Sequence, residues 1–202
     1  MQELVKEAYE LFSHYDAPRP LDVCITCCMD PRDEERLASM KVNEIPLELL
    51  MEYNDEASSG DTPTTEIKHF FPRILEFMVK DSFPSHSEEI CLGRFSPFKS
   101  CEWTEPELLF LRKFSTLLFT HYLQIYPIQD GMTPDAILIM FWRGDFDLDP
   151  ILDAWLNNDS WQSVLNFKEF YFNGFVDENR NRLNNSFAEQ SISLKLKSWL
   201  GS

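Results

Sequence analysis

The stretch TEPELLFLRKFSTLLFTHYLQI, residues 104–125, decides the fold class. Thr104 and Glu107 have the spacing of a capping box, in which each side chain bonds a backbone N–H of the other residue. Apolar residues then recur every three or four positions, which predicts a long helix with one buried face. Pro127 predicts its end. The residues of the buried face are Leu108, Leu111, Phe114, Leu118 and Tyr122.

Helix signals also precede this stretch. Residues 2–13 and 46–56 each place their apolar side chains on one face. Thr65 is expected to cap a helix that continues to Met78. Pro72 lies inside that pattern, where it marks either a kink or the true start of the helix one turn later.

The C-terminal part carries further helix starts. Thr133-Pro134 and Asp149-Pro150 each combine a capping side chain with a proline suited to the first turn. A helix is expected over residues 160–173, and Ser186 opens a second capping box before the last helix. Strand character is confined to Leu21–Cys27.

These signals predict a mainly α fold. We expect one helical domain over residues 1–202, with about seven to nine helices and little or no sheet. The 6 glycines leave little material for tight hairpins. The apolar share of 44% is that of a globular protein, so the chain can build a core.

The charge of the chain limits its partners. It has 34 acidic residues against 18 basic ones, a net charge of −16. A small domain ordinarily stays within about 2–8 charges of neutrality. Such an excess repels nucleic acid and anionic membranes and attracts basic proteins. We therefore expect a basic protein partner, and neither nucleic acid nor membrane.

The acids gather in two segments. Residues 43–66 contain no Lys or Arg, and residues 129–161 contain only Arg143. Either the segments form a landing surface for a cationic partner, or they are solvated faces that keep the protein soluble. The candidate partner-binding residues are Glu48, Glu52, Asp55, Glu56, Asp61, Asp145, Asp147 and Asp149.

The cysteines are more typical of buried thiols than of a metal site. Cys24, Cys27 and Cys28 form a CxxCC cluster, but no second CxxC completes a zinc site. Zinc held by this cluster and His69 stays an alternative; otherwise these are small thiols that pack a loop. The chain also lacks the common hydrolase and nucleotide-binding motifs. We therefore expect no catalytic residue, metal or cofactor.

Location follows from the same composition. The acidic N-terminus lacks the basic start and apolar stretch of a secretory signal, and no apolar run approaches the roughly 18 residues of a membrane span. The five cysteines are an odd number, which is unusual for a disulfide framework. We expect a reduced, cytoplasmic protein.

Three motifs carry a resemblance. They are CxxCCM at 24–29, LLxxY at 49–53 and EIKHFFPRILE at 66–76. With these motifs, residues 1–125 resemble a group of small, acidic, uncharacterised bacterial proteins that are associated with polymorphic toxin systems and look like immunity proteins. The resemblance implies a protein that binds and blocks a cognate toxin. The resemblance does not extend to residues 126–202, for which the helical pattern is the only information.

The resulting hypothesis is a non-enzymatic inhibitor. An immunity (antitoxin-like) protein would neutralise a basic bacterial toxin domain by covering its active site, with carboxylates pairing to the toxin's Lys and Arg side chains. The alternative is a zinc- or thiol-dependent regulator or enzyme that uses Cys24, Cys27 and Cys28. A further alternative is an acidic mimic of nucleic acid, which shares the charge argument.

Overall fold

Helices make up nearly all the regular structure of the protein, as a computed structural model shows. The structure describes residues 1–26, 29–55, 62–95, 102–127, 132–176 and 179–201. In chain order its elements are α1 (Gln2–Phe12), α2 (Pro31–Ser39), η1 (Val42–Glu44), α3 (Leu47–Asp55), α4 (Thr64–Met78), η2 (Glu88–Ile90), α5 (Glu105–Leu123), α6 (Pro134–Arg143), α7 (Asp149–Leu156), α8 (Trp161–Asn173) and α9 (Gln190–Leu200). Within those ranges the β-type pairing is a single isolated bridge, between Phe175 and Leu183. The predicted mainly α, single-domain fold is confirmed.

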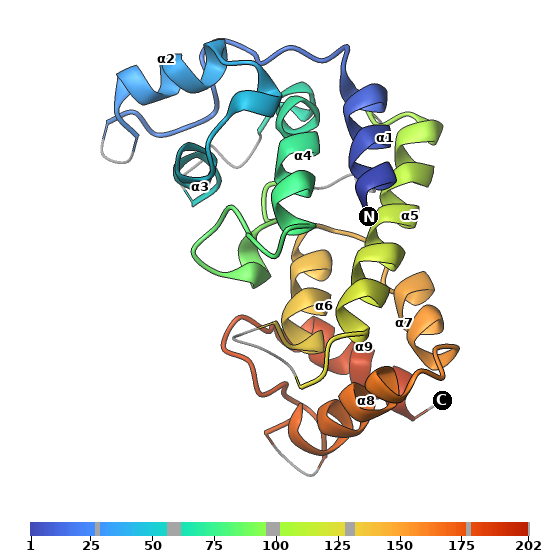
Figure 1. Cartoon of the computed structure of the whole chain (residues 1–202). Coiled ribbons are helices and arrows are strands. Elements are labelled where there is room, and N and C mark those ends of the chain that lie inside the picture. Colours follow the sequence, from blue (N-terminus) through green and yellow to red (C-terminus); the bar gives the residue numbers. More distant parts are fainter. Residues whose placement is uncertain (27–28, 56–61, 96–101, 128–131, 177–178, 202) are drawn as a thin grey trace.

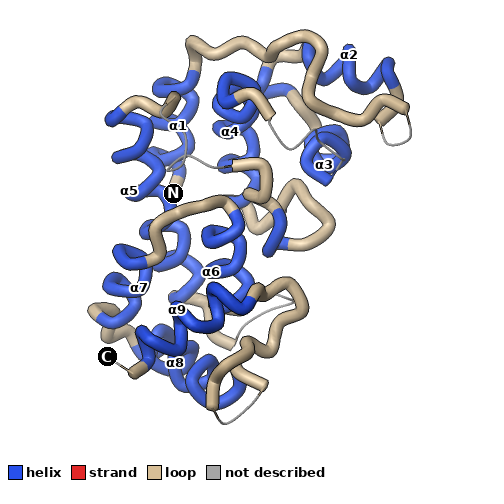
Figure 2. The backbone as a smooth tube through the Cα atoms, turned by 180° about the vertical axis from the view of Figure 1, so that it is seen from behind, coloured by secondary structure: helices blue, strands red, loops and turns tan. Residues whose placement is uncertain are grey.

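Helix α5 joins the two halves of the molecule (Figure 1). Phe110, near its start, meets Phe12 of α1, whereas Phe119, two to three turns later, meets Trp155 of α7. Seen from both sides, α2 and α3 lie at one end of the molecule and α8 and α9 at the other (Figures 1 and 2). None of the described helices is long and apolar enough to cross a membrane.

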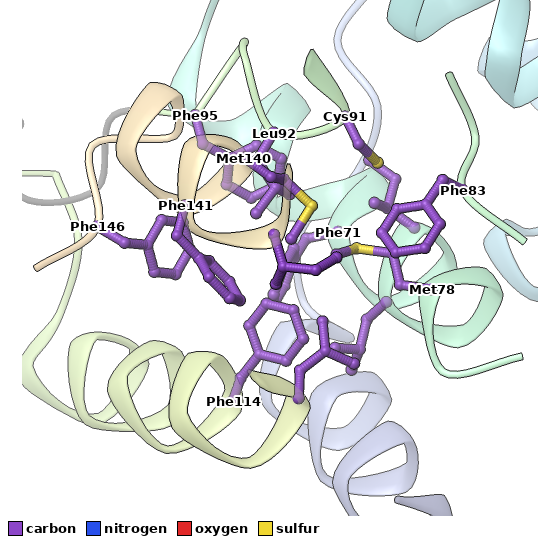
Figure 3. Close-up of a cluster of buried hydrophobic side chains, with 14 of the residues drawn as sticks. Phe71, Met78, Phe83, Cys91, Leu92, Phe95, Phe114, Met140, Phe141 and Phe146 are labelled. Carbon is purple, nitrogen blue, oxygen red and sulfur yellow. The ribbon is translucent and has the colours of Figure 1, made fainter. Parts of the chain in front are cut away.

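The core centres on the predicted apolar face of α5. Phe114 is fully buried and meets the rings of Phe71, Phe141 and Phe146 edge-on, at centroid distances of 5.5, 5.9 and 6.4 Å (Figure 3). Edge-to-face contacts are the favoured geometry of aromatic pairs. The core is therefore an aromatic cluster shared by α4, α5, α6 and the loop after α6.

Two predicted helix starts are confirmed by their hydrogen bonds. The Thr104 N–H donates to Glu107 Oε2 at 2.7 Å, as a capping box requires. The Ala136 N–H donates to Thr133 Oγ1 at 3.4 Å. Pro72 lies inside α4, which continues on both sides of it.

Other predicted boundaries were wrong. Ser186 caps no helix, because the side-chain and backbone oxygens of Asn185 accept the N–H groups of Phe187 and Ala188 and close a turn there, so α9 begins at Gln190. Asp149 is the first residue of α7 and not its cap; its N–H donates to the carboxylate of Asp147.

Two further predictions on the N-terminal side also failed. Helix α4 begins at Thr64, before the expected cap Thr65, because the Pro63 carbonyl already accepts the first helical bond. The segment Leu21–Cys27 forms no strand over its described residues, 21–26. Backbone groups of this segment form hydrogen bonds with side chains instead; for example, the Leu21 N–H donates to the Glu34 carboxylate.

A buried ion pair fastens α4 to the start of α5. Lys68 Nζ lies 2.9 Å from Glu107 Oε2, and the two side chains are 2% and 1% exposed. Lys68 also donates to the Glu102 carbonyl and the Tyr15 hydroxyl, at 2.7 and 3.0 Å. Burial alone would raise the pKa of Glu107, but the hydrogen bonds from Lys68, the Thr104 backbone and Tyr15 lower it. The carboxylate therefore stays ionised in the interior.

The contacts of Glu76 are expected to make the stability of the fold depend on pH. Burial raises its pKa, but hydrogen bonds from Lys80, Tyr9 and Arg73 outweigh burial and lower it to about 2. A lowered folded-state pKa stabilises the fold above the unfolded value, and this stability is lost as the pH falls toward 2. Glu76→Gln should lower the free energy of unfolding by about 1–2 kcal/mol at pH 7, allowing for solvent screening.

The measurement is urea denaturation of the variant and the parent from pH 7 to pH 2. The difference between them should shrink below about pH 4.5, where the unfolded chain takes up its proton. Glu10→Gln, which removes an exposed ion pair with Lys6, is the matched control and should change little. A difference that is constant with pH would refute the assigned role of Glu76.

Candidate protein-binding surface

Helix α3 presents two free carboxylates. Glu48 and Glu52 are one helical turn apart and exposed. In the described part of the chain, neither forms a hydrogen bond or an ion pair. Their charge is therefore unneutralised and directed to solvent, as a surface that attracts cations requires.

Glu48 and Glu52 line one side of a groove, and helix α2 forms the other side. Helix α2 packs against α3, and a shallow hollow of about 330 Å³ lies between the two helices. The hollow contains one cation, Arg36, which is 3.9 Å from Asp33. Its lining residues are Asp33, Arg36, Pro46, Glu48, Leu49 and Glu52. This α2–α3 groove thus has three acids against one base, and suits a Lys or Arg side chain.

Sequence reasoning missed α2 and with it Asp33. The signal was present, because Asp30 is followed by Pro31 and by acids in the first turn. Asp30 caps the helix by accepting the Arg32 N–H at 2.8 Å. Leu37 alone is buried in α2, so the apolar periodicity that identified the other helices is absent there.

Asp55, at the end of α3, holds the fold together. Its carboxylate accepts the Ser85 hydroxyl at 2.7 Å and the His86 N–H at 2.9 Å. The His86 ring Nδ1 lies 3.1 Å from the same carboxylate. Asp55 therefore anchors the loop after α4 and has less charge to offer a partner than Glu48 or Glu52.

The three candidate acids of the second segment are also tied to the fold. Asp145 is half-buried with a positive φ of 60°, and Asp147 accepts the first N–H of α7. Asp149 is exposed but forms an ion pair with Lys195 of α9. The two segments are not brought together, since α3 and α7 lie in opposite halves of the molecule (Figures 1 and 2).

Four of the candidate residues lie outside the described residues: Glu56, Asp61, Cys27 and Cys28. Of the remaining zinc candidates, Cys24 is half-buried and His69 Nδ1 lies 2.8 Å from the Tyr15 carbonyl. Among the described residues no three His, Cys, Asp or Glu side chains are grouped to hold a metal. Burial raises the pKa of the Cys91 thiol, which disfavours the reactive thiolate there.

A second acidic hollow, of about 470 Å³, lies between the start of α6 and the end of α8. The Asn185 amide bridges two of its acids, donating to Glu89 at 2.8 Å and to Asp135 at 3.1 Å. Burial raises the pKa of Asp135, despite hydrogen bonds that lower it. The bridging amide gives these acids a structural role, and the α2–α3 groove has the freer charge.

Comparisons of the chain with protein-family models, curated proteins and solved structures find no match. The α2–α3 groove and the three sequence motifs are therefore the features of this chain that bear on its function.

Proposed function

We propose that this chain is a non-enzymatic, cytoplasmic immunity protein that binds a basic bacterial toxin domain and neutralises it by occlusion. The observation that supports this most is the α2–α3 groove, where Glu48 and Glu52 are exposed and unpaired beside Asp33. The net charge of −16 and the resemblance of residues 1–125 to immunity-like proteins point the same way.

The groove would act in two steps. Its field first attracts the cationic face of the toxin domain, and attraction between opposite surfaces raises the rate of encounter. Lys or Arg side chains of the toxin then pair with Glu48 and Glu52. A toxin that binds an anionic substrate needs those same cations, so their capture and the bulk of the inhibitor together would block the active site.

Removing the two free carboxylates tests this proposal. The Glu48→Gln/Glu52→Gln variant should associate roughly three- to tenfold more slowly with the toxin domain at low salt, with a smaller change in dissociation. The effect should fade as salt shortens the screening length to about 8 Å and below. The measurement is stopped-flow association with a candidate toxin domain; where a neighbouring gene encodes a large secreted protein, its C-terminal domain is the candidate.

The matched control removes the same charge elsewhere. Glu3 and Glu105 are exposed acids on α1 and α5, away from the groove. Glu3→Gln/Glu105→Gln should leave association close to the parent rate. Equal slowing by both double variants would mean that only total charge matters, and no slowing by either would remove the groove from the proposal.

A further inference from the structure

Helix α8 buries one face against the fold and exposes apolar side chains on the other. Ser163, Asn166 and Phe170 are buried against the rest of the molecule. On the opposite side, Trp161, Val164 and Phe172 are 61%, 54% and 69% exposed. Exposed apolar side chains that gather on one face of a protein often mark an interaction site. The exposed face of α8 lacks a cover among the described residues.

The exposed side chains form one continuous stripe. Positions 161, 164, 168 and 172 follow the three- and four-residue spacing of a single helix face. We call these four residues, Trp161, Val164, Lys168 and Phe172, the outer face of α8. Lys168 lies within the stripe, where its carbon stem adds apolar surface while its ammonium reaches solvent.

The fold holds this face in place. The Asn166 amide, on the buried side, donates to the carbonyls of Leu123 and Ile125 at 3.1 Å each, which fixes α8 to the end of α5. The Tyr126 ring packs edge-on against Trp161 with centroids 6.3 Å apart. A preorganised Trp is the residue type that most often dominates a protein interface.

The charges around the outer face of α8 indicate which kind of partner it would bind. Asp159 is exposed two residues before Trp161, and the exposed Glu169 accepts a hydrogen bond from Tyr126, whose ring packs on Trp161. Arg180 stacks on Tyr171 near the other end of the face. A second copy of the chain, with its net charge of −16, would add like charge to the rim. A basic partner would place cations against Asp159 and Glu169.

We propose that the outer face of α8 is a second protein-docking surface, and that it takes a basic amphipathic helix. The 13 residues of α8 extend about 20 Å, which matches a partner helix of three to four turns. Helices α2 and α3, which line the α2–α3 groove, lie at the other end of the molecule, so the groove would remain open (Figures 1 and 2). This proposal is independent of the toxin assignment.

The test uses two synthetic peptides of equal Leu and Lys content. One repeats Leu at helical spacing, so that it forms an apolar stripe bordered by lysines; the other scrambles the order and has no stripe. Binding is measured by fluorescence anisotropy at physiological salt. The amphipathic peptide should bind at least tenfold more tightly than the scrambled one. Trp161→Ala/Phe172→Ala should weaken it about tenfold, since anchors of this type dominate affinity.

Two variants sharpen the result. Leu109→Ala/Leu117→Ala removes exposed apolar side chains from α5 and should leave binding unchanged. Lys168→Glu should tighten it, because it removes a repulsive cation from the face. Equal binding of both peptides, or equal loss in both double variants, would overturn the proposal. So would a parent protein that is dimeric by sedimentation and becomes monomeric in Trp161→Ala/Phe172→Ala, since a second copy would then be the occupant.

Discussion

Replacing Lys68 with methionine is expected to lower the free energy of unfolding by about 3–5 kcal/mol. The substitution leaves the Glu107 carboxylate, 1% exposed, without its counter-ion, and leaves the Glu102 carbonyl without its Lys68 donor. Removing one member of a buried pair costs far more than the pair itself contributes, because the other charge stays buried. Urea denaturation at pH 7 measures the loss.

The neighbouring residues supply the controls. Lys68→Met/Glu107→Gln should recover part of the stability, because glutamine is neutral and can still accept the Thr104 N–H. Lys113→Met removes an exposed pair with Glu7, in which both side chains are about half exposed, and should cost less than about 1 kcal/mol. A loss of that small size in Lys68→Met would contradict a buried, desolvated pair.

Phe114→Ala is expected to cost about 3–5 kcal/mol. The ring is fully buried where α4, α5 and α6 meet, so its removal leaves a cavity that Phe71, Phe141 and Phe146 can only partly fill (Figure 3). Chemical denaturation measures the change, and an unaltered slope with denaturant would show that the unfolded state is comparable.

Leu117, three residues along the same helix, provides the comparison. It is 42% exposed, so Leu117→Ala should cost about 1 kcal/mol or less. If the two variants lost similar stability, the apolar face of α5 would not be the centre of the core.

The sequence predicted the helices whose signals are local. Thr104 and Thr133 cap as expected because a capping bond joins residues three apart. The predicted cap at Ser186 was wrong because Asn185 accepts hydrogen bonds from the nearby backbone N–H groups. Residue type alone does not decide which of two polar side chains bonds the backbone. Helix α2 was missed because it buries little, so apolar spacing carried no signal there.

The candidate surface was predictable only in part. The exposure of Glu48 and Glu52 follows from the apolar face of α3, which sets them on the other side. The pairing of Asp149 with Lys195 and the position of Asp33 beside α3 depend on contacts between distant segments. No local pattern reports those contacts, and for that reason the two acidic segments looked equivalent in sequence.

We propose above that this chain neutralises a basic toxin domain. The most direct test is growth of a bacterial host that produces a candidate toxin domain, with and without the chain itself; a candidate is the C-terminal domain of any large secreted protein that a neighbouring gene encodes. The account predicts that the domain alone arrests growth and that co-production of the chain restores it, with a 1:1 complex recoverable from the cells. Persistent arrest, with both proteins present in soluble form and no complex, would contradict it.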